Sequence, residues 1–263
     1  MLIVGSGAAL ALWHDDGIDN RKDDRAGQAA APPAVTPEPA VPPKPKVTAS
    51  AKPKTSPSSS APANKDKKDE KPDEKDVPAS GSGTFTTAQA SGGAVGSGTL
   101  RRYRVQVEDG ADVSARQAAE EIQAILAHPR GWAAHGRARF QLVSENADFV
   151  IRIATPKTAD KLCLAQGLNT RGELNCETTQ GVVVNLRRWM LGSPTFAGSP
   201  AEYRHLIINH EVGHEIGIRQ HMGCPGPGKL APVMMQQIKG LNGCRSNAYP
   251  YDEDGSYISG PIV

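Results

Sequence analysis

The sequence predicts an α+β domain confined to residues 100–263 of a 263-residue chain. Three observations support this. Residues 26–84 contain no Leu, Ile, Met, Phe, Tyr or Trp, so most large apolar side chains lie in the carboxyl-terminal part. That part contains short segments in which apolar and polar residues alternate, which is the period of half-buried strands. It also contains two segments that begin with helix-capping residues.

The first 99 residues are expected to lie outside this fold. Residues 1–13 are apolar and uncharged, but a bilayer-spanning helix needs about 20 such residues, and no basic region precedes them. We therefore interpret residues 1–25 as a truncated signal or anchor segment. Residues 26–99 are rich in Pro, Ala, Lys and Ser, and this composition cannot bury enough apolar surface to offset the entropy of ordering. They are predicted to form a disordered linker.

The charge balance argues against one class of partner. The chain has 30 Lys and Arg residues and 28 Asp and Glu residues, which gives a formal net charge of +2. In residues 65–76 the lysines alternate with acidic residues. Proteins that bind nucleic acids normally carry a basic patch of one sign. No nucleic-acid partner is therefore expected.

The domain is predicted to open with a strand and a helix. Apolar and polar residues alternate over residues 101–108, and Asp109-Gly110 then supplies a turn. Ser114 is a suitable N-cap for the helix that follows. Apolar residues recur at helical spacing until Pro129 ends the pattern.

Three strands and a long helix complete the prediction. Residues 138–143 and 148–154 are the next strands, and the β-branched run at 181–186 fits a buried strand. The last helix has Ser199 as its N-cap, a proline at its first position and a glutamate at its third. It is expected to run to Gly217, a residue suited to a left-handed C-cap.

Four cysteines lie in the predicted domain, and none belongs to a C-x-x-C pair of the kind found in structural zinc sites. Two disulfides are the simplest interpretation, and they would place the protein in an oxidising compartment. Three pairings are possible. We favour the two that are local in sequence and close Gly-rich loops: Cys163 with Cys176, and Cys224 with Cys244. The alternative is four reduced cysteines in a cytosolic protein.

The last helix carries a metal-binding pattern, His210-Glu211-Val212-Gly213-His214. Residues i and i+4 of a helix lie about 40° apart on one face, so His210 and His214 can reach the same zinc ion. Glu211 would then lie beside the open position of the metal, where it can take a proton from bound water.

A catalytic zinc needs a third protein ligand. His221 is the best candidate, because Gly217 ends the helix and lets the chain turn back towards the metal. Asp252 and Asp254 are alternative ligands. Cys224, three residues after His221, could also bind metal if it were not in a disulfide.

Two resemblances extend this prediction. The helix and its continuation to His221 resemble the extended zinc pattern of the metzincin proteases, H-E-x-x-H-x-x-G-x-x-H, with one extra residue before the last histidine. Residues 231–235 resemble the Met-turn of those proteases. Six segments resemble the family catalogued as domain of unknown function 3152: T-R-G-E-L-N-C (170–176), V-V-V-N-L-R-R-W (182–189), N-H-E-V-G-H-E-I-G (209–217), H-M-G-C-P-G-P-G (221–228), A-P-V-M-M-Q-Q (231–237) and G-L-N-G-C (240–244).

The family resemblance covers about residues 100–250. It implies a secreted or membrane-anchored protein with a zincin-like metallopeptidase fold, in which a mixed and mostly antiparallel sheet accompanies the metal-binding helix. Carried over residue by residue, it implies a role for five positions: His210, His214 and His221 as zinc ligands, Glu211 as general base and Met234 as the Met-turn methionine.

We therefore expect an extracytoplasmic zinc peptidase that acts on a peptide or protein substrate, with membrane attachment through its amino-terminal segment as a possibility. The alternative is a non-catalytic cell-envelope binding domain that keeps the fold and the zinc. A serine hydrolase is disfavoured, because no Gly-x-Ser-x-Gly motif occurs. His205 and Tyr203 are expected to be structural, while Tyr249 and Tyr251 are candidate donors to a developing oxyanion.

Overall fold

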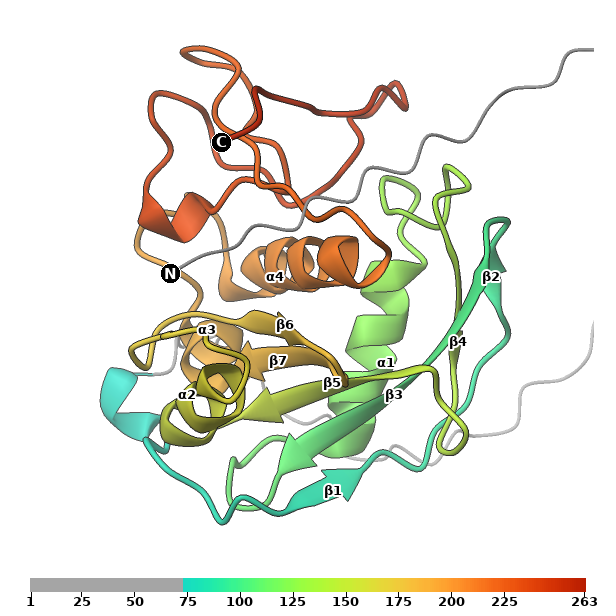
Figure 1. Cartoon of the computed structure of the whole chain (residues 1–263), viewed down its shortest axis with the longest axis vertical. Helices are drawn as coiled ribbons and strands as arrows, with labels where there is room; N and C mark the ends of the chain where they lie inside the picture. Colours follow the sequence, from blue (N-terminus) through green and yellow to red (C-terminus); the bar gives the residue numbers. More distant parts are fainter. Residues whose placement is uncertain (1–72) are drawn as a thin grey trace, which may run out of the picture. The chain divides into compact units, whose positions relative to one another are not determined.

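A computed structural model describes residues 73–263 of the chain. Within that range, one seven-stranded sheet is combined with four α-helices (Figure 1). The strands are β1 (Phe85–Thr87), β2 (Val95–Gly96), β3 (Leu100–Glu108), β4 (Arg139–Leu142), β5 (Phe149–Ala154), β6 (Cys176–Thr178) and β7 (Gly181–Asn185). The helices are α1 (Ala115–Leu126), α2 (Pro156–Leu164), α3 (Leu186–Leu191) and α4 (Pro200–Glu215). The expectations for residues 1–72 lie outside the described residues.

The sheet is mixed, and its four central strands are parallel. The strand order is β2-β4-β3-β5-β7-β6, with β1 paired to the second half of β3. The pairs β3–β4, β3–β5 and β5–β7 are parallel, whereas β1, β2 and β6 each join antiparallel. The α+β class and the mixed sheet are confirmed. The expectation that the sheet is mostly antiparallel is wrong.

The connections explain why these strands can be parallel. Parallel neighbours need a long crossover, and α1 supplies one between β3 and β4, while α2 lies in the connection from β5 to β7. Only residues 143–148 join β4 to β5. This short connection is long enough because β4 pairs with Leu100–Tyr103 and β5 pairs with Tyr103–Val107. β5 therefore begins beside β3 at the level where β4 ends, and the chain does not have to return along the sheet.

The folded domain begins before residue 100. Phe85 lies opposite Glu108 in the β1–β3 pair, and Val95 lies opposite Phe140 in the β2–β4 pair. Both short strands fall inside the 26–99 stretch that the composition predicts to be linker. Short edge strands join a sheet through backbone hydrogen bonds and need few large apolar side chains, so composition does not reveal them.

Helices cover both faces of the sheet. In β7, Val182 and Val184 belong to the main core together with residues of α1, α3 and α4, whereas Val183 packs on the opposite face with residues of α2. This alternation follows from the two-residue period of a strand. The metal-binding pattern is therefore on the side of the sheet that carries the larger core.

Helix α4 lies next to the sheet edge formed by β6 and β7, and it also contacts α1 and α3 (Figure 1). At its start, the Ser199 hydroxyl accepts a hydrogen bond from the amide of Glu202 at 3.1 Å. The helix ends at Glu215, and Gly217 has a φ of 101°, which glycine adopts at little cost. The predicted start is confirmed, and the end lies two residues earlier than expected.

Both predicted disulfides are present. Cys163–Cys176 joins α2 to β6, and Cys224–Cys244 joins two loops that follow α4. The first braces the sheet edge next to α4. The second closes the loop 224–244, which contains the predicted Met-turn and begins three residues after His221.

Candidate metal centre

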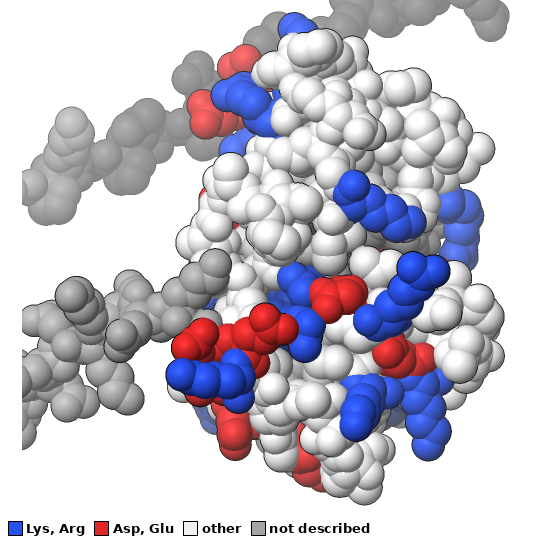
Figure 2. Space-filling view, turned by 90° about the vertical axis from the view of Figure 1, so that its left-hand side faces the viewer, with Lys and Arg blue, Asp and Glu red and all other residues white. Residues whose placement is uncertain are grey.

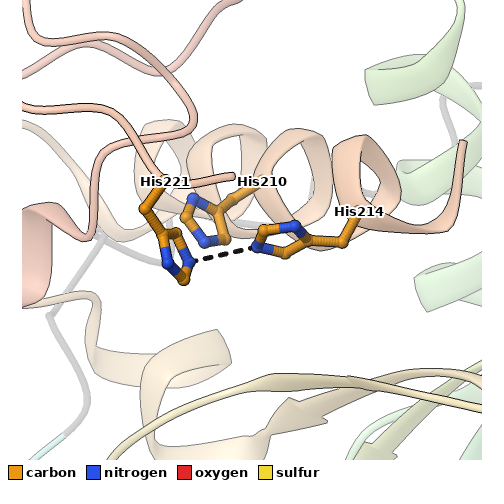
Figure 3. Close-up of side chains that lie close together, drawn as sticks. All are labelled: His210, His214 and His221. Carbon is orange, nitrogen blue, oxygen red and sulfur yellow. Dashed lines mark hydrogen bonds between the residues drawn. The ribbon is translucent and has the colours of Figure 1, made fainter. Parts of the chain in front are cut away.

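Three histidines converge beside α4. His210 and His214 lie one turn apart on the helix, and His221 approaches them from the loop that follows (Figure 3). One ring nitrogen from each of the three lies within 4.8 Å of the others. The Nε2 atoms of His214 and His221 are 3.2 Å apart. Two nitrogens bound to one tetrahedral zinc at 2.0–2.1 Å would be separated by about 3.3–3.4 Å, so this spacing fits a shared metal ion.

Backbone carbonyls orient the two helical imidazoles. The Nδ1 of His210 lies 2.8 Å from the carbonyl oxygen of Val233, and the Nδ1 of His214 lies 2.7 Å from that of Ile218. A carbonyl oxygen only accepts, so each Nδ1 carries the proton and each Nε2 presents a lone pair. Outer partners of this kind fix the tautomer of metal-binding histidines.

Burial favours the uncharged form of the three imidazoles. Burial lowers the pKa of His210 to about 3, and burial also lowers the pKa values of His214 and His221. A neutral imidazole is the form that binds a metal ion. Protonation of the cluster is therefore disfavoured, and the three neutral imidazoles form a suitable ligand set for a divalent cation.

The turn after α4 directs His221 back to the helix. The amide of Ile218 donates to the carbonyl of Gly213 at 3.0 Å, and the carbonyl of the same Ile218 receives the proton of His214. The amide of Met222 then donates to the carbonyl of Met234 at 3.1 Å. The extra residue between Gly217 and His221, compared with the metzincin pattern, is accommodated within this turn.

Met234 lies against the helix backbone at Gly213, a residue that stands between the two histidines in the sequence. Its side chain is fully buried, and a Cβ atom added at Gly213 would lie 2.5 Å from its sulfur and 3.3 Å from the ring of Trp132. Gly213 therefore allows Met234 to pack directly under α4. A methionine suits this position because its thioether side chain fills irregular apolar gaps. The glycine inside the motif was a signal that the sequence interpretation did not use.

Glu211 is buried next to the histidines, with 6% of its surface exposed. Burial raises the pKa of its carboxyl group to about 8, and the nearby negative charge of Glu177 acts in the same direction. A carboxyl group with a pKa near neutrality can both accept and return a proton under physiological conditions. Without a metal ion this carboxyl group is mostly protonated at pH 7, and the positive charge of a cation bound beside it would favour the carboxylate.

The histidines and Glu211 line an open cleft of about 390 Å³. Its opposite wall is formed by residues 168–170, by 174–177, which include the start of β6, and by Arg219. Gln236 and Lys239 complete the lining. The cleft is open to solvent, so the ring nitrogens of the histidines can be reached from outside.

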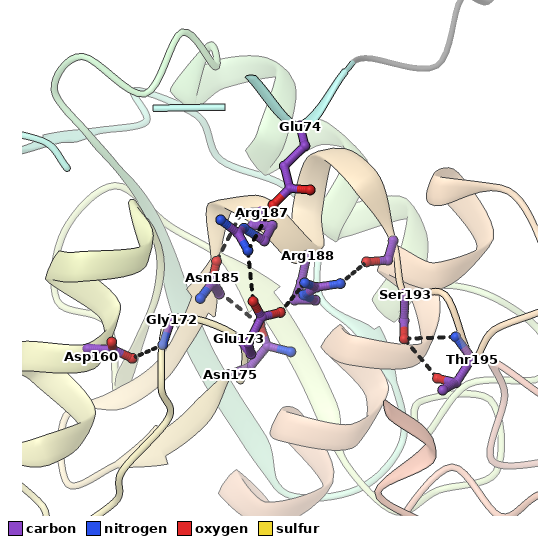
Figure 4. A network of polar contacts seen from close by, with 11 residues as sticks. Glu74, Asp160, Gly172, Glu173, Asn175, Asn185, Arg187, Arg188, Ser193 and Thr195 are labelled. Atoms are coloured by element: carbon purple, nitrogen blue, oxygen red, sulfur yellow. Dashed lines mark hydrogen bonds and ion pairs between the residues drawn. The ribbon is translucent and has the colours of Figure 1, made fainter. Parts of the chain in front are cut away.

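A network of polar contacts holds the segment before β6 in place (Figure 4). Glu173 forms ion pairs with Arg187 at 2.7 Å and with the nearly buried Arg188. The side chain of Asn175 accepts a hydrogen bond from the amide of Asn185 at 2.9 Å. These contacts join the cleft wall to the end of β7 and to α3. Sequence patterns did not identify them, because they link residues that belong to no recognisable motif.

One further hydrogen bond and one further ion pair extend this network. Asp160 accepts a hydrogen bond from the amide of Gly172 at 2.7 Å, and Arg187 also pairs with Glu74 at 3.1 Å. Figure 2 shows one face of the molecule, on which acidic and basic side chains lie beside one another rather than in separate patches.

The alternative ligands lie elsewhere. Among residues 73–263, the group of potential ligands around the histidines contains neither Asp252 nor Asp254. Asp252 instead closes a turn by accepting hydrogen bonds from the amides of Asp254 and Ser256, at 3.1 and 2.8 Å. Cys224 is in a disulfide and has no thiolate to offer.

The remaining candidates have packing roles or lie apart from the cleft. Tyr203 is 2% exposed in the main core, as expected for a structural residue. His205 packs beside His128 and Tyr249, with ring centroids at 5.4 and 5.2 Å. Neither Tyr249 nor Tyr251 lines the cleft, so neither is placed to stabilise an oxyanion there.

These features define an α+β protein whose candidate site is a histidine triad with an adjacent buried glutamate. The chain matches the family model described as "Protein of unknown function (DUF3152)" over residues 71–259. It therefore belongs to this family, as its sequence motifs predict. No curated protein and no solved structure matches the chain.

Proposed function

We propose that this protein is a zinc-dependent peptidase with a zincin-like active site that acts outside the cytoplasm. The observation that carries the proposal is the convergence of His210, His214 and His221 beside the buried Glu211. Three imidazoles are the protein ligands of some catalytic zinc sites, in which water takes the fourth position. Met234 beneath the helix supports the same proposal through the resemblance to a Met-turn.

The roles of the residues follow from their surroundings. His210, His214 and His221 would hold the metal through Nε2 atoms, which the carbonyl contacts on two of the rings leave free. A bound zinc ion would supply Lewis acidity, polarising a carbonyl group and lowering the pKa of a water molecule towards 7. Glu211 would take the proton from that water and pass it to the leaving amine.

The cleft supports a peptide as the substrate class. It is open to solvent, and β6 runs along it at the edge of the sheet, so an extended chain can lie next to Glu211. Its lining combines an apolar side chain, Leu174, with polar ones such as Asn175 and Gln236. A peptide presents both kinds of group.

The proposed location rests on the disulfides. Two disulfides form in this domain, and such bonds persist mainly in oxidising compartments. This weakly favours a secreted or membrane-anchored protein. In the part of the chain that the structure describes, no helix combines the length and apolar character needed to cross a bilayer.

Zinc content and cleavage of a diverse peptide library together test the proposal. The zinc-loaded protein is expected to cleave peptides, and a chelator is expected to abolish cleavage. Glu211→Gln should retain zinc and lose more than about 100-fold of the activity, because general-base catalysis contributes 10²–10⁴-fold. Undiminished cleavage by this variant would rule out the assigned role. Bound zinc without chelator-sensitive cleavage would instead support a non-catalytic binding domain.

A further inference from the structure

The carboxyl-terminal residues 260–263 pair with the segment that carries His221. The amide of Val263 donates a hydrogen bond to the carbonyl of His221 at 3.2 Å. In the opposite direction, the amide of Gly223 donates to the carbonyl of Pro261 at 2.7 Å. The two bonds form a short antiparallel pairing, so the backbone of the candidate third ligand is held directly by the tail.

The segment is held on its other side as well. Met222 forms an antiparallel bridge with Ile262, while its own amide donates to the carbonyl of Met234 at 3.1 Å. His221 and Met222 therefore lie between the tail and the turn that packs under α4. The segment that carries His221 is therefore held by backbone hydrogen bonds on both sides, through His221 on one side and Met222 on the other.

A close approach of two glycines makes this pairing possible. A Cβ atom added at Gly260 would lie 2.0 Å from the carbonyl oxygen of Gly223 and 3.0 Å from the ring of Pro232. A contact of 2.0 Å is far below any permitted separation, so only glycine fits here without displacing the tail. Glycine in such positions typically marks a close approach of two backbones.

The tail does not dock through apolar burial. The side chains of Ile262 and Val263 are 54% and 78% exposed. The hydrophobic effect scales with the apolar area removed from water, and these two residues remove little. Residues 260–263 therefore hold the His221 segment through their backbone rather than through their side chains.

His221 depends on this support more than the other two histidines do. The rings of His210 and His214 are each oriented by a carbonyl oxygen at their Nδ1 atoms. Within residues 73–263, no group forms a hydrogen bond with the Nδ1 of His221. His221 also lies outside the helices and strands of this range. Its imidazole is therefore oriented through its backbone rather than through a partner on the ring.

We propose that residues 260–263 are a positioning element that holds His221 in reach of the metal. This inference rests on the metal site of the proposed function. Without the tail, His221 would sample more orientations, and the site would behave more like a two-histidine site. Loss of outer-shell support typically costs 10–100-fold in metal affinity, so we expect a weakening of about that size.

The test compares the zinc affinities of four variants with that of the parent chain by competition with a chromogenic chelator. One variant ends at Ser259 and lacks the tail. In a second, Val263→Pro removes the amide that donates to His221, and Val263→Ala is its matched control because it keeps that amide. His221→Ala serves as the reference for complete loss of the third ligand.

The variant that ends at Ser259 should bind zinc about 10–100-fold more weakly than the parent chain. Val263→Pro should bind zinc at least several-fold more weakly. Val263→Ala should match the parent chain. Hydrogen exchange of the Gly223 amide gives a readout without metal, and it should accelerate when the tail is absent. Parent-like affinity in both tail variants, with weaker binding by His221→Ala, would overturn the positioning role. If the truncated chain fails to fold, Val263→Pro decides the question. Unchanged affinity in His221→Ala would instead reject the three-histidine site itself, and the tail proposal with it.

Discussion

The Nδ1 atom of His210 lies 2.8 Å from the carbonyl oxygen of Val233. The next residue, Met234, places its sulfur against the helix at Gly213. One turn of the chain therefore orients a histidine and also packs beneath the helix that carries it. Because these contacts come from adjacent residues, a change in the packing under α4 should also change the orientation of the His210 ring at the candidate metal site.

Gly213→Ala tests this coupling. Alanine is favoured over glycine in a helix interior by about 0.8–1 kcal/mol, so an uncrowded site would be stabilised. Here the new methyl group would meet Met234 and Trp132, and we expect a net loss of about 1–3 kcal/mol in the free energy of unfolding. Denaturant unfolding measures the change.

A double-mutant cycle with Met234→Ala assigns the cause. If the methyl group acts through Met234, the double variant should lose less unfolding free energy than the two single variants lose together. The expected difference is about 0.5–3 kcal/mol. Simple additivity would show that Gly213 and Met234 are not coupled.

The two disulfides should affect zinc differently. They close segments of 13 and 20 residues, so the chain-entropy model assigns about 3 kcal/mol of stability to each. Replacing Cys224 and Cys244 by serine should also weaken zinc binding, because Cys224 is three residues from His221. The matched control replaces Cys163 and Cys176, and it should lower stability with little change in zinc affinity. Equal zinc affinities in the two double variants would contradict this difference.

His205 should make the fold sensitive to acid. Burial lowers its pKa to about 4, with smaller contributions from the positive charges of His128 and Arg204. The unfolded chain, in which the pKa is near 6.5, then binds the proton more strongly. Stability from this residue is therefore present above about pH 6.5 and is lost as the pH falls towards 4.

Thermal unfolding of His205→Gln between pH 7 and 4, with a chelator in every sample, checks this sign. The variant should lose less stability on acidification than the parent chain does. His135→Gln, which also removes one imidazole, controls for the number of histidines. Parallel pH profiles for the parent and His205→Gln would contradict the assignment.

Glu173→Gln should weaken the cleft wall. The change leaves Arg188, whose side chain is 8% exposed, without the carboxylate that pairs with it. Uncompensated buried charges are costly, and we expect a loss of about 1–3 kcal/mol in the free energy of unfolding. The matched control is Glu74→Gln, because Glu74 is 68% exposed and surface ion pairs contribute about 1 kcal/mol or less. Equal effects of the two substitutions would show that the wall does not depend on Glu173.

Local signals in the sequence were sufficient for several elements. The N-cap Ser199 and the terminating Gly217 predict α4, and cysteines that are close in sequence predict both disulfides. The spacing of His210 and His214 follows from the helical repeat, which explains why one face of α4 could be anticipated. Each of these inferences depends on residues within about 20 positions of one another.

The remaining features depend on contacts between distant segments. The parallel order of β4, β3, β5 and β7 is set by which strands pair, and a single sequence does not encode that in a local pattern. Helix α2 was not predicted, because it spans only nine residues and its sequence shows no extended apolar periodicity. The ion pairs of Glu173 and the contact of Gly213 with Met234 join segments whose proximity only the fold creates.

Zinc coordination measured on the whole chain shows whether the three histidines bind one metal ion together. The protein, loaded with one equivalent of zinc and then dialysed, is examined by zinc-edge X-ray absorption. We expect one retained zinc per chain, with three imidazole nitrogens at about 2.0–2.1 Å and one oxygen ligand. Zinc should be lost when His210 or His214 is replaced by alanine. Failure to retain zinc, or a coordination shell without three imidazoles, would contradict the account.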